Sequence, residues 1–484
     1  MRIFAAETSW LDEPPLVVDL DGTLLRSDLL VESGLVFLRD QPHRFLAPLK
    51  WLTQGKATLK HQLAHAADLD VSVLPYDKAV IAFIQRERAR RRKVVLATSS
   101  HRRVAEQVAE HLGLFDEIFA SDADCNLSAH TKRDVLVHAF GKQGFDYAGN
   151  SKDDLPVWGS ARKAYVVNAR PSIARRARNG GNVAEVLRSD QTLVRDWIKA
   201  LRLHQWVKNV LILVPLLAAH RYHELPLVID ALVAFFCFGL CASSVYILND
   251  LLDLRDDRHH ARKRSRPFAA GRLSLLSGLL MSPLLLLAAF IVAGLRLPLM
   301  FTAALATYYL LTLAYSFSLK RRMVIDVITL AALYTLRIVA GAVPLGIPLS
   351  FWLLAFSMFM FLSLAFVKRY AELFQGRAEG STQKARGRGY FPDDLHMIAA
   401  LGAAAGYMAV MVLSLYINDA HTTQLYRRPE LIWLACPLLL TWISRVWMFA
   451  HRGRMNEDPV IFAFRDRVSL LIGGLLALVF LAAA

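Results

Sequence analysis

The sequence has little cysteine, and its start lacks the apolar core of a signal peptide. Only 4 of its 484 residues are cysteine, and their positions match neither a disulfide framework nor the spacing of a zinc site. The simplest role for them is that of small buried apolar residues. The first fifteen residues, MRIFAAETSWLDEPP, contain no long apolar stretch and no small-residue cleavage site. We therefore expect no cleaved leader.

Long apolar runs are also missing from the first 200 residues, although the chain as a whole is 55% hydrophobic. Such runs begin only near residue 206. The chain is long enough for two or three domains, and this segregation predicts a soluble region followed by a membrane region. Lys and Arg number 57 against 41 Asp and Glu, a net charge of +16. Because much of the excess lies in loops between apolar runs, it suits an anionic membrane surface or phosphorylated substrates, and we expect no nucleic-acid partner.

Charged side chains are most concentrated in the stretch 249–267, NDLLDLRDDRHHARKRSRP. Asp250, Asp253 and Asp257 have i, i+3, i+7 spacing, which stacks three carboxylates on one face of an α-helix. Like charges this close favour a bound divalent cation, and Mg²⁺ fits because it prefers oxygen ligands and substrate phosphates. The basic residues that follow are suited to phosphate oxygens; they are Arg258, Arg262, Lys263, Arg264 and Arg266. The stretch indicates either a diphosphate site or a solvated mixed-charge loop, and the apolar run before it places it at a membrane surface and favours function.

The soluble region shows apolar strands that end in polar residues. Residues 15–18 lead into Asp19 and Asp21, and 93–97 lead into a run of hydroxyl side chains. Helical patterns such as 101–112 separate the strands, which predicts an α/β, Rossmann-like fold with a parallel sheet. In such sheets, sites form at the carboxyl edge of the strands.

Four of these pieces, in order, resemble the haloacid dehalogenase (HAD) family of phosphohydrolases over roughly residues 14–170. The pieces are DLDGT, the strand ending at Thr98, the segment around Lys132, and GNSKDD at 149–154. The resemblance implies that Asp19 is the nucleophile, that Asp21 is the general acid and base, and that Thr98 and Lys132 hold phosphoryl oxygens. It also implies a Mg²⁺ site; its candidate ligands are Asp19, Asp21, Asn150 and Asp154.

The chain departs from the family at Asn150, where an aspartate is usual. The domain is therefore either an active hydrolase or a weak one kept for binding or folding. We place it at 1–170, with a helical cap at about 24–90. A linker over 171–204 follows, whose helical pattern from residue 192 fits an interfacial helix or a packed surface helix. The transmembrane domain then spans 205–484.

The membrane region is predicted to be an all-α bundle of about nine transmembrane helices. Four of its connecting loops together hold 21 Lys and Arg, whereas the loops between them hold 4. Because positive charge stays inside, we expect an integral protein of the inner (cytoplasmic) membrane, with the soluble domain and the active sites on the cytoplasmic side.

The charged loops form a composite site in this prediction. Asp326 and Arg337 are ionisable residues within one apolar run, so they are expected to face the bundle interior. Further candidates for binding phosphates lie in the loops, together with the acidic stretch; they are Arg266, Lys320, Lys368, Arg369 and Arg388.

Residues 200–484 resemble the UbiA superfamily of intramembrane prenyltransferases, whose first acidic motif, NDxxDxxxD, stands at Asn249, Asp250, Asp253 and Asp257. The resemblance implies that these four residues hold Mg²⁺ and that the three aspartates are catalytic. The second acidic motif usual in the family is matched only in part, by Asp326.

Further segments are similar to the decaprenyl-phosphate phosphoribosyltransferases within this superfamily. They are QWVKN, which contains Lys208 and Asn209, KRSRP at 263–267, KRYAEL at 368–373 and DPV at 458–460. This branch joins phosphoribosyl diphosphate to a polyprenyl phosphate, with the lipid phosphate as nucleophile.

Three hypotheses follow. The first is a Mg²⁺-dependent transferase that moves a phosphoribosyl group to a polyprenyl phosphate, with the HAD domain removing the 5-phosphate of the product. The second is a prenyltransferase that uses prenyl diphosphate and an aromatic or other small acceptor. The third is a lipid-binding or transport scaffold without catalysis. All three work in a lipid bilayer, alone or as a homo-oligomer.

Overall fold

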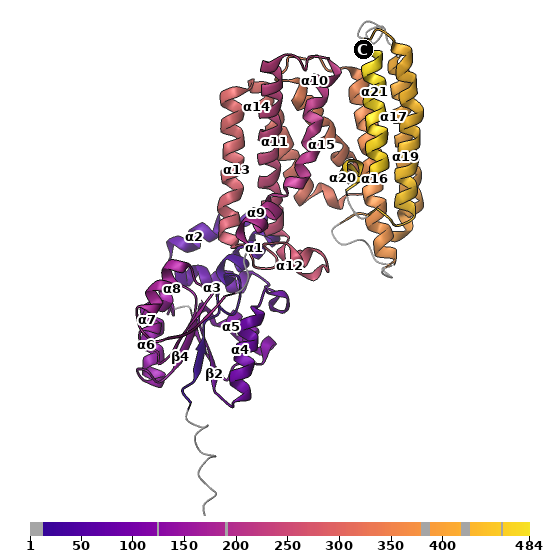
Figure 1. Ribbon diagram of the computed structural model, residues 1–484. Helices are drawn as coiled ribbons and strands as arrows, with labels where there is room; N and C mark the ends of the chain where they lie inside the picture. Colours follow the sequence, from indigo (N-terminus) through magenta and orange to yellow (C-terminus); the bar gives the residue numbers. More distant parts are fainter. Residues whose placement is uncertain (1–12, 123–124, 189–191, 379–387, 418–425, 456–457) are drawn as a thin grey trace, which may run out of the picture. The chain divides into compact units, whose positions relative to one another are not determined.

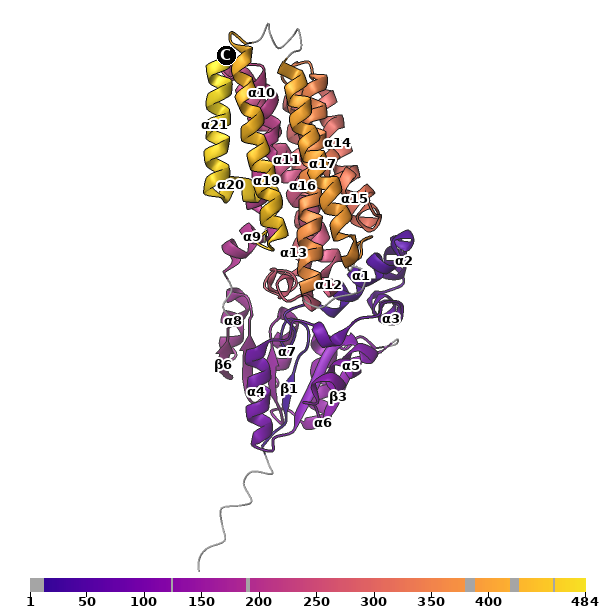
Figure 2. The same cartoon turned by 90° about the vertical axis from the view of Figure 1, so that its right-hand side faces the viewer.

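The computed structural model describes residues 13–122, 125–188, 192–378, 388–417, 426–455 and 458–484. It divides the chain into two compact units. The first is Met1–Leu201 with Tyr246–Ser282, and the second is Arg202–Val245 with Pro283–Ala484. Figures 1 and 2 show the chain from two directions. The first unit is therefore built from the N-terminal region and a later segment, 246–282, that contains the acidic stretch.

The first unit contains a six-stranded parallel sheet with the order β3-β2-β1-β4-β5-β6, so the predicted parallel sheet is confirmed. Its strands are β1 Leu16–Val18, β2 Val94–His101, β3 Glu117–Ser121, β4 Asp146–Gly149, β5 Ala164–Val167 and β6 Val183–Leu187. The central strand β1 pairs with β2 and β4, with Val18 opposite both Leu96 and Ala148. The order reverses at β1, which places its carboxyl end beside those of β2 and β4.

Helices cover both faces of this sheet, and the alternation of side chains along β1 explains how. Leu16 and Val18 belong to the core cluster that contains helices α4 and α5, whereas Val17 belongs to the cluster with α6, α7 and α8. Successive strand residues point to opposite faces, so a short apolar strand buried on both sides feeds two cores. The helices are α4 Lys78–Ala89, α5 Arg102–Leu112, α6 Ala129–Phe140, α7 Leu155–Trp158 and α8 Pro171–Arg178.

A helical insertion between β1 and β2 has a small core of its own, around Phe37, Leu59 and Leu63. It consists of α1 Leu29–Asp40, α2 Ala47–Thr53 and α3 Lys56–Ala66, with the short helices η1 Pro42–Arg44 and η2 Val71–Val73 beside them. Helix α4, at the end of the region expected to form the cap, instead packs into the core of the sheet.

The sheet extends past residue 170 into the segment that we expected to be linker. Strand β6 pairs with β5 at the edge of the sheet and is only partly buried, and this half-exposed pattern is weak evidence in sequence alone. Helix α9, Leu193–Leu201, follows with Leu193, Val194 and Ile198 exposed and Asp196 buried against Arg272.

The second unit is helical, and its helices run side by side in Figure 1, with α16 packed against α15 and α17. Its elements are η4 Leu203–Leu213, α10 Val214–Ala218, α14 Leu299–Phe317, η6 Leu319–Arg321, α15 Ile325–Ala342, α16 Phe351–Ala378, η7 Pro392–Asp394, α17 Leu395–Ile417, η8 Pro429–Leu434, α19 Ala435–His451, α20 Pro459–Arg465 and α21 Arg467–Ala483. Two further helices, α11 Leu225–Leu252 and α13 Leu275–Arg296, contain the boundaries between the units.

Nine membrane spans are not confirmed. Among the described residues, seven helices are long and apolar enough to cross a bilayer, or eight if α20 and α21, which meet at a bend of 81°, count as one. The first expected span, near 206–219, is the shorter apolar stretch Leu203–Ala218. Most of it is wound as a 3-10 helix, and Pro215 lies at the start of its only α-helical turn. Seven apolar helices nevertheless make this an integral membrane protein.

The four cysteines are all free thiols. Cys237, Cys241 and Cys436 are buried, as expected, but Cys125 is exposed. The expectation that all four are buried was therefore wrong at Cys125, which precedes α6 in a connecting segment.

Candidate functional site

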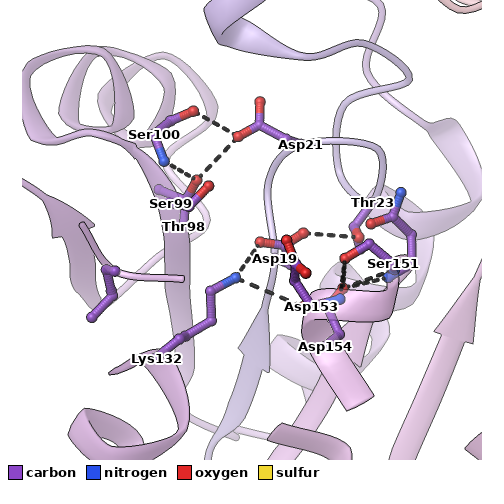
Figure 3. Close-up of polar contacts among 12 residues, drawn as sticks. Asp19, Asp21, Thr23, Thr98, Ser99, Ser100, Lys132, Ser151, Asp153 and Asp154 are labelled. Atoms are coloured by element: carbon purple, nitrogen blue, oxygen red, sulfur yellow. Dashed lines mark hydrogen bonds and ion pairs between the residues drawn. The ribbon is translucent and has the colours of Figure 1, made fainter. Parts of the chain in front are cut away.

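The first candidate site lies at the carboxyl edge of the central strands, where Asp19 follows β1 directly. Asp19 is 6% exposed and accepts a hydrogen bond from Lys132 Nζ at 2.7 Å. Thr23 Oγ1 donates to its other oxygen at 3.3 Å. Burial raises the pKa of Asp19 to about 7, against the lowering effect of Lys132. Figure 3 shows the lysine reaching from α6 toward this carboxylate.

Asp21 lies two residues further on and is held by the end of β2. Ser100 Oγ donates to Asp21 at 2.6 Å and Thr98 Oγ1 at 3.4 Å, and the backbone N–H of Leu29 donates at 2.8 Å. Burial raises the pKa of Asp21 to about 6. A carboxyl group with this pKa can both release and accept a proton near neutral pH. The predicted neighbourhood of Asp19, Asp21, Thr98 and Lys132 is therefore present in the structure (Figure 3).

Asp154 organises the loop that follows β4. Its Oδ2 accepts from the backbone N–H groups of Asn150 and Ser151 at 3.0 and 2.9 Å, and from Ser151 Oγ at 3.0 Å. Its Oδ1 accepts from Tyr147 Oη at 2.7 Å. Both oxygens are therefore occupied by protein donors, so Asp154 holds the loop in place.

Asn150 is the residue of this loop that best fits a cation. Its Oδ1 is buried and has no hydrogen-bond partner among the described residues, and its side chain lies against Gly22. A Cβ on Gly22 would meet Asn150 Nδ2 at 2.0 Å, and the φ of Gly22 is +75°. Glycine is required there by both space and backbone conformation. An orphan side-chain carbonyl oxygen in this loop suits Mg²⁺, which prefers oxygen ligands.

Lys60 is a residue of this site that the sequence did not single out. It lies on α3 and donates to the carbonyl oxygen of Ser99 at 2.5 Å and to Asn126 Oδ1 at 2.8 Å. Burial lowers its pKa, against the raising effect of Asp21. The helical insertion thus brings a second cation, after Lys132, toward Asp21. No local sequence pattern distinguishes this lysine from its neighbours.

The acidic stretch is helical in the first unit, but the helix is interrupted. Helix α11 ends at Leu252 and α12, Leu254–His259, begins after Asp253, which has φ −96° and ψ 14°. The backbone N–H of Asp253 donates to the carbonyl of Asn249, and that of Asp257 donates to the carbonyl of Asp253. The expected single helical face through Asp250, Asp253 and Asp257 is therefore broken at its middle member.

Arg266 brings the two outer aspartates together. Its Nη1 lies 3.1 Å from Asp250 Oδ1 and 2.6 Å from Asp257 Oδ2, and both aspartates are 2% exposed. Burial raises the pKa of Asp257 to about 6, and Arg266 opposes this. Two buried carboxylates that share one cation form a donor set that Mg²⁺ fits. Asn249 and Asp253 are half-buried beside them.

An ion pair that the sequence did not reveal connects α12 to the helical insertion. Arg258 Nη2 lies 2.6 Å from Glu32 Oε1, with side chains 5% and 2% exposed. Two exposed contacts accompany it, between Arg39 and Asp256 at 2.6 Å and between His259 and Asp70 at 2.9 Å. The acidic stretch and the phosphatase-like region are thus packed within one unit.

The second unit holds the remaining predicted cations in two clusters. In the first, Asp458 Oδ2 accepts from Lys208 Nζ at 2.7 Å and from Lys368 Nζ at 3.3 Å. Tyr334 Oη donates to the other carboxylate oxygen at 3.4 Å. Burial alone would raise the pKa of Asp458, but the two lysines hold it well below its usual range. Two lysines on one carboxylate leave this cluster with an excess positive charge.

Arg337 lies in the bundle interior, as predicted, and is 4% exposed. It donates to Asn209 Oδ1 at 3.1 Å and to Tyr308 Oη at 2.8 Å. Asp326 is also fully buried, but it pairs with Arg369 and not with Arg337. Arg369 Nη2 lies 2.7 Å from Asp326, and both side chains are 0% exposed. Both interior predictions are confirmed.

The second cluster extends from this buried pair toward the loop after α16. Tyr390 Oη donates to Asp326 at 2.6 Å, and Glu372 pairs with Arg369 and, at 3.6 Å, with Arg388. Tyr315 Oη accepts from Arg388 at 3.0 Å. Lys320 is half-buried in η6. Arg369 is therefore neutralised inside the protein, whereas Arg388 and Lys320 lie nearer the surface.

The chain is similar to known proteins along most of its length. Residues 210–466 match the UbiA prenyltransferase family. An uncharacterised protein, y4nM, of Sinorhizobium fredii is 36% identical over 97% of this chain and 91% of its own length. The nodulation protein NoeC of Azorhizobium caulinodans is 39% identical over 59% of this chain and 92% of its own length. Decaprenyl-phosphate phosphoribosyltransferase of Mycolicibacterium smegmatis is 31% identical over 57% of this chain and 89% of its own length. On this similarity, the protein belongs to the UbiA prenyltransferase family.

Proposed function

We propose that this protein is a Mg²⁺-dependent membrane transferase that moves a phosphoribosyl group from phosphoribosyl diphosphate to a polyprenyl phosphate. The observation that carries the proposal is the convergence of Lys208 and Lys368 on Asp458, in a chain similar to decaprenyl-phosphate phosphoribosyltransferases. Such a reaction must bind a diphosphate, a 5-phosphate and a lipid phosphate, and it needs more cations than transfer of an uncharged prenyl group.

The acidic stretch would bind the leaving diphosphate. Asp250, Asp253 and Asp257, with Asn249 beside them, would hold Mg²⁺, which would supply charge neutralisation to the diphosphate as it departs. Arg266 already contacts two of these carboxylates and is 29% exposed on its side chain. Its guanidinium can turn from the carboxylates to phosphate oxygens when the substrate arrives.

The lysine pair would bind a phosphate of the acceptor or the sugar. Asp458 holds the two ammonium groups in one place before the substrate binds, which lowers the cost of bringing them together. Lys320 and Arg388 are the further candidates, because neither is sealed into the interior. Arg369 and Arg337 would act as positioning residues, since each is buried among protein partners.

The buried pair of Asp326 with Arg369 bears on the choice of donor. A prenyltransferase of this superfamily usually has a second acidic motif for the cation, and Asp326 is its only partial match here. Because Asp326 is fully buried and paired, it is poorly placed to ligate an ion. This favours phosphoribosyl diphosphate over prenyl diphosphate, which remains the second candidate donor with a small aromatic acceptor.

The N-terminal region would act as a HAD-type phosphatase on the product of the transferase. In this proposal an Asp19 oxygen attacks phosphorus, the bond from phosphorus to the ribose oxygen breaks, and Asp21 gives its proton to that oxygen. Water then cleaves the acyl phosphate, with Asp21 as the base. Lys132, Thr98 and Lys60 would hold phosphoryl oxygens, and Asp19, Asp21 and Asn150 would hold Mg²⁺, with Asp154 supporting the loop.

We place both reactions on the cytoplasmic side of the inner membrane, in accord with the positive charge of the loops. A tethered second enzyme meets its substrate at a high effective concentration. The lipid would reach the transferase from the bilayer without passing through water.

The transferase proposal is tested with membranes, labelled phosphoribosyl diphosphate, polyprenyl phosphate and Mg²⁺. Wild type should form a labelled lipid, and Asp253→Ala should lose at least 100-fold in rate, since one carboxylate ligand of the ion is removed. Asp230→Ala, in the first two turns of α11, is the matched control and should stay active. Activity with prenyl diphosphate and none with phosphoribosyl diphosphate would establish the second candidate. A function that is unchanged in Asp253→Ala would favour a non-catalytic scaffold.

The phosphatase proposal is tested by mass spectrometry of the lipid products. Asp19→Asn should accumulate a lipid that is heavier by one phosphoryl group, while the rate of the transfer step stays at the wild-type level. Asp134→Asn, which alters an exposed carboxylate on α6, is the control. Identical lipid profiles for wild type and Asp19→Asn would reject a role for this domain in the pathway.

A further inference from the structure

Three histidines from two elements meet at the edge of the helical insertion. His61 and His65 lie one turn apart on α3, a spacing that puts both on the same face of a helix. His101 is the last residue of β2. One ring nitrogen from each lies within 4.8 Å of the other two. Neither the transferase nor the phosphatase chemistry proposed above uses any of them.

The distances between these nitrogens fit a shared metal ion. His61 Nδ1 and His101 Nε2 are 3.1 Å apart and share a hydrogen bond, which a bound ion would replace. Two nitrogens at 2.0–2.1 Å from one zinc ion in tetrahedral geometry are separated by about 3.3 Å. The His61 and His65 rings have centroids 4.4 Å apart, and those of His65 and His101 are 5.4 Å apart, so the three rings form one cluster.

A hydrogen bond to the backbone fixes the tautomer of His65 that can bind a metal ion. Its Nδ1 lies 2.8 Å from the carbonyl oxygen of His61, so it donates its proton there and leaves the Nε2 lone pair free. A backbone carbonyl that fixes the tautomer in this way is typical of histidines that ligate metals. His65 is exposed, which gives an ion a path to the site.

His101 can also bind a metal ion, but it would lose one hydrogen bond in doing so. Burial together with His61 and His65 lowers its pKa, and the neutral ring is the form that binds metal. Its Nδ1 accepts a bond of 3.2 Å from the backbone N–H of Arg103. Coordination through Nε2 moves the ring proton to Nδ1 and gives up this long bond at the start of α5.

We propose that His61, His65 and His101 bind one Zn²⁺ ion, which fastens the helical insertion to the end of β2. The sequence neighbours of these histidines reach the Asp21 site, since Ser100 donates to Asp21 and Lys60 donates to the carbonyl of Ser99. Imidazole ligands favour zinc over magnesium, so this ion is distinct from the Mg²⁺ proposed at Asp19. Three protein ligands and an exposed rim leave one position for water or a substrate oxygen.

The test uses the full-length protein in detergent, purified through a tag without histidines and stripped with a chelator. Zn²⁺ is titrated against a chromophoric competitor in excess Mg²⁺, which occupies the carboxylate sites. Wild type should bind one Zn²⁺ more per chain than His65→Ala, and Zn²⁺ should raise the unfolding temperature of wild type but not that of His65→Ala. His43→Ala, another exposed histidine of the insertion, should match wild type.

Cobalt gives an independent readout, because Co²⁺ bound to imidazole nitrogens absorbs in the visible range with an intensity that reports its geometry. The band should appear in wild type and in His43→Ala and should be lost in His65→Gln, a substitution at an exposed position that keeps the helix. The proposal would be overturned if wild type bound no more Zn²⁺ than His65→Ala.

Discussion

The buried pair of Glu32 and Arg258 offers a quantitative test of how the acidic stretch is supported. Glu32 accepts two hydrogen bonds from Arg258, at 2.6 and 3.1 Å, and one from Ser27 Oγ at 2.5 Å. Arg258 Nε donates to the carbonyl of Ala269 at 3.0 Å. The guanidinium has no other counterion among these contacts, so Glu32 supplies the charge that allows it to be buried.

Replacing Glu32 by Gln keeps the size of the side chain and removes its charge. A buried charge that loses its partner costs about 3 to 5 kcal/mol, which corresponds to a fall of roughly 10 °C in the unfolding temperature of a unit of this size. Arg258 follows Asp257 directly, and Asp257 shares Arg266 with Asp250. The transferase rate should therefore fall as well, although no residue that binds substrate has been changed.

The assay is thermal unfolding in detergent, followed by tryptophan fluorescence, together with the labelled lipid assay. Glu110→Gln, at an exposed glutamate of α5, is the control and should behave as wild type. The double variant Glu32→Met with Arg258→Met removes both charges and should recover most of the lost stability. A Glu32→Gln protein within 1 kcal/mol of wild type, or a double variant no more stable than the single one, would refute the reasoning.

Three further predictions concern single positions. Gly22→Ala should reduce phosphate release at least tenfold, because its Cβ has no room. The control Gly113→Ala has φ +61° but open space around it, so it should cost only about 1 kcal/mol of stability. Equal losses of phosphate release in the two variants would contradict this. Burial raises the pKa of Asp257 to about 6, so without Mg²⁺ the folded state keeps a proton that the unfolded state loses above pH 4, and stability falls as the pH rises to 6. The rise in unfolding temperature caused by Mg²⁺ should therefore grow from pH 5 to pH 7 in wild type and stay level in Asp257→Asn. The same pH dependence in both proteins would contradict this role of Asp257. Arg369→Met should cost about 3 to 5 kcal/mol by leaving Asp326 unpaired, measured by thermal unfolding, and an unchanged midpoint would show that the pair is not buried in solution.

Local patterns in the sequence predicted much of the architecture. The run before Asp19 is apolar at every position, as a strand buried on both faces must be, and it forms the central strand of a parallel sheet. The interior positions of Asp326 and Arg337 were also predictable, because a charged side chain in an apolar helix has no favourable place outside the bundle. The edge strand β6 was missed, since a half-exposed strand of five residues has too weak a pattern to stand out.

The sequence by itself determined which chemical groups the chain carries and which lie at the ends of strands and spans. It determined these features because strand alternation, helix spacing and span length depend on residues close together along the chain. Only the tertiary structure decided which charges neutralise one another. Lys208 and Asp458 are 250 positions apart and Arg258 and Glu32 are 226 apart, and no local pattern encodes such a pairing. The same packing brought Asp250 and Asp257 to Arg266, because a charge can stay buried only where a partner from another element meets it. It also gathered three histidines from α3 and β2.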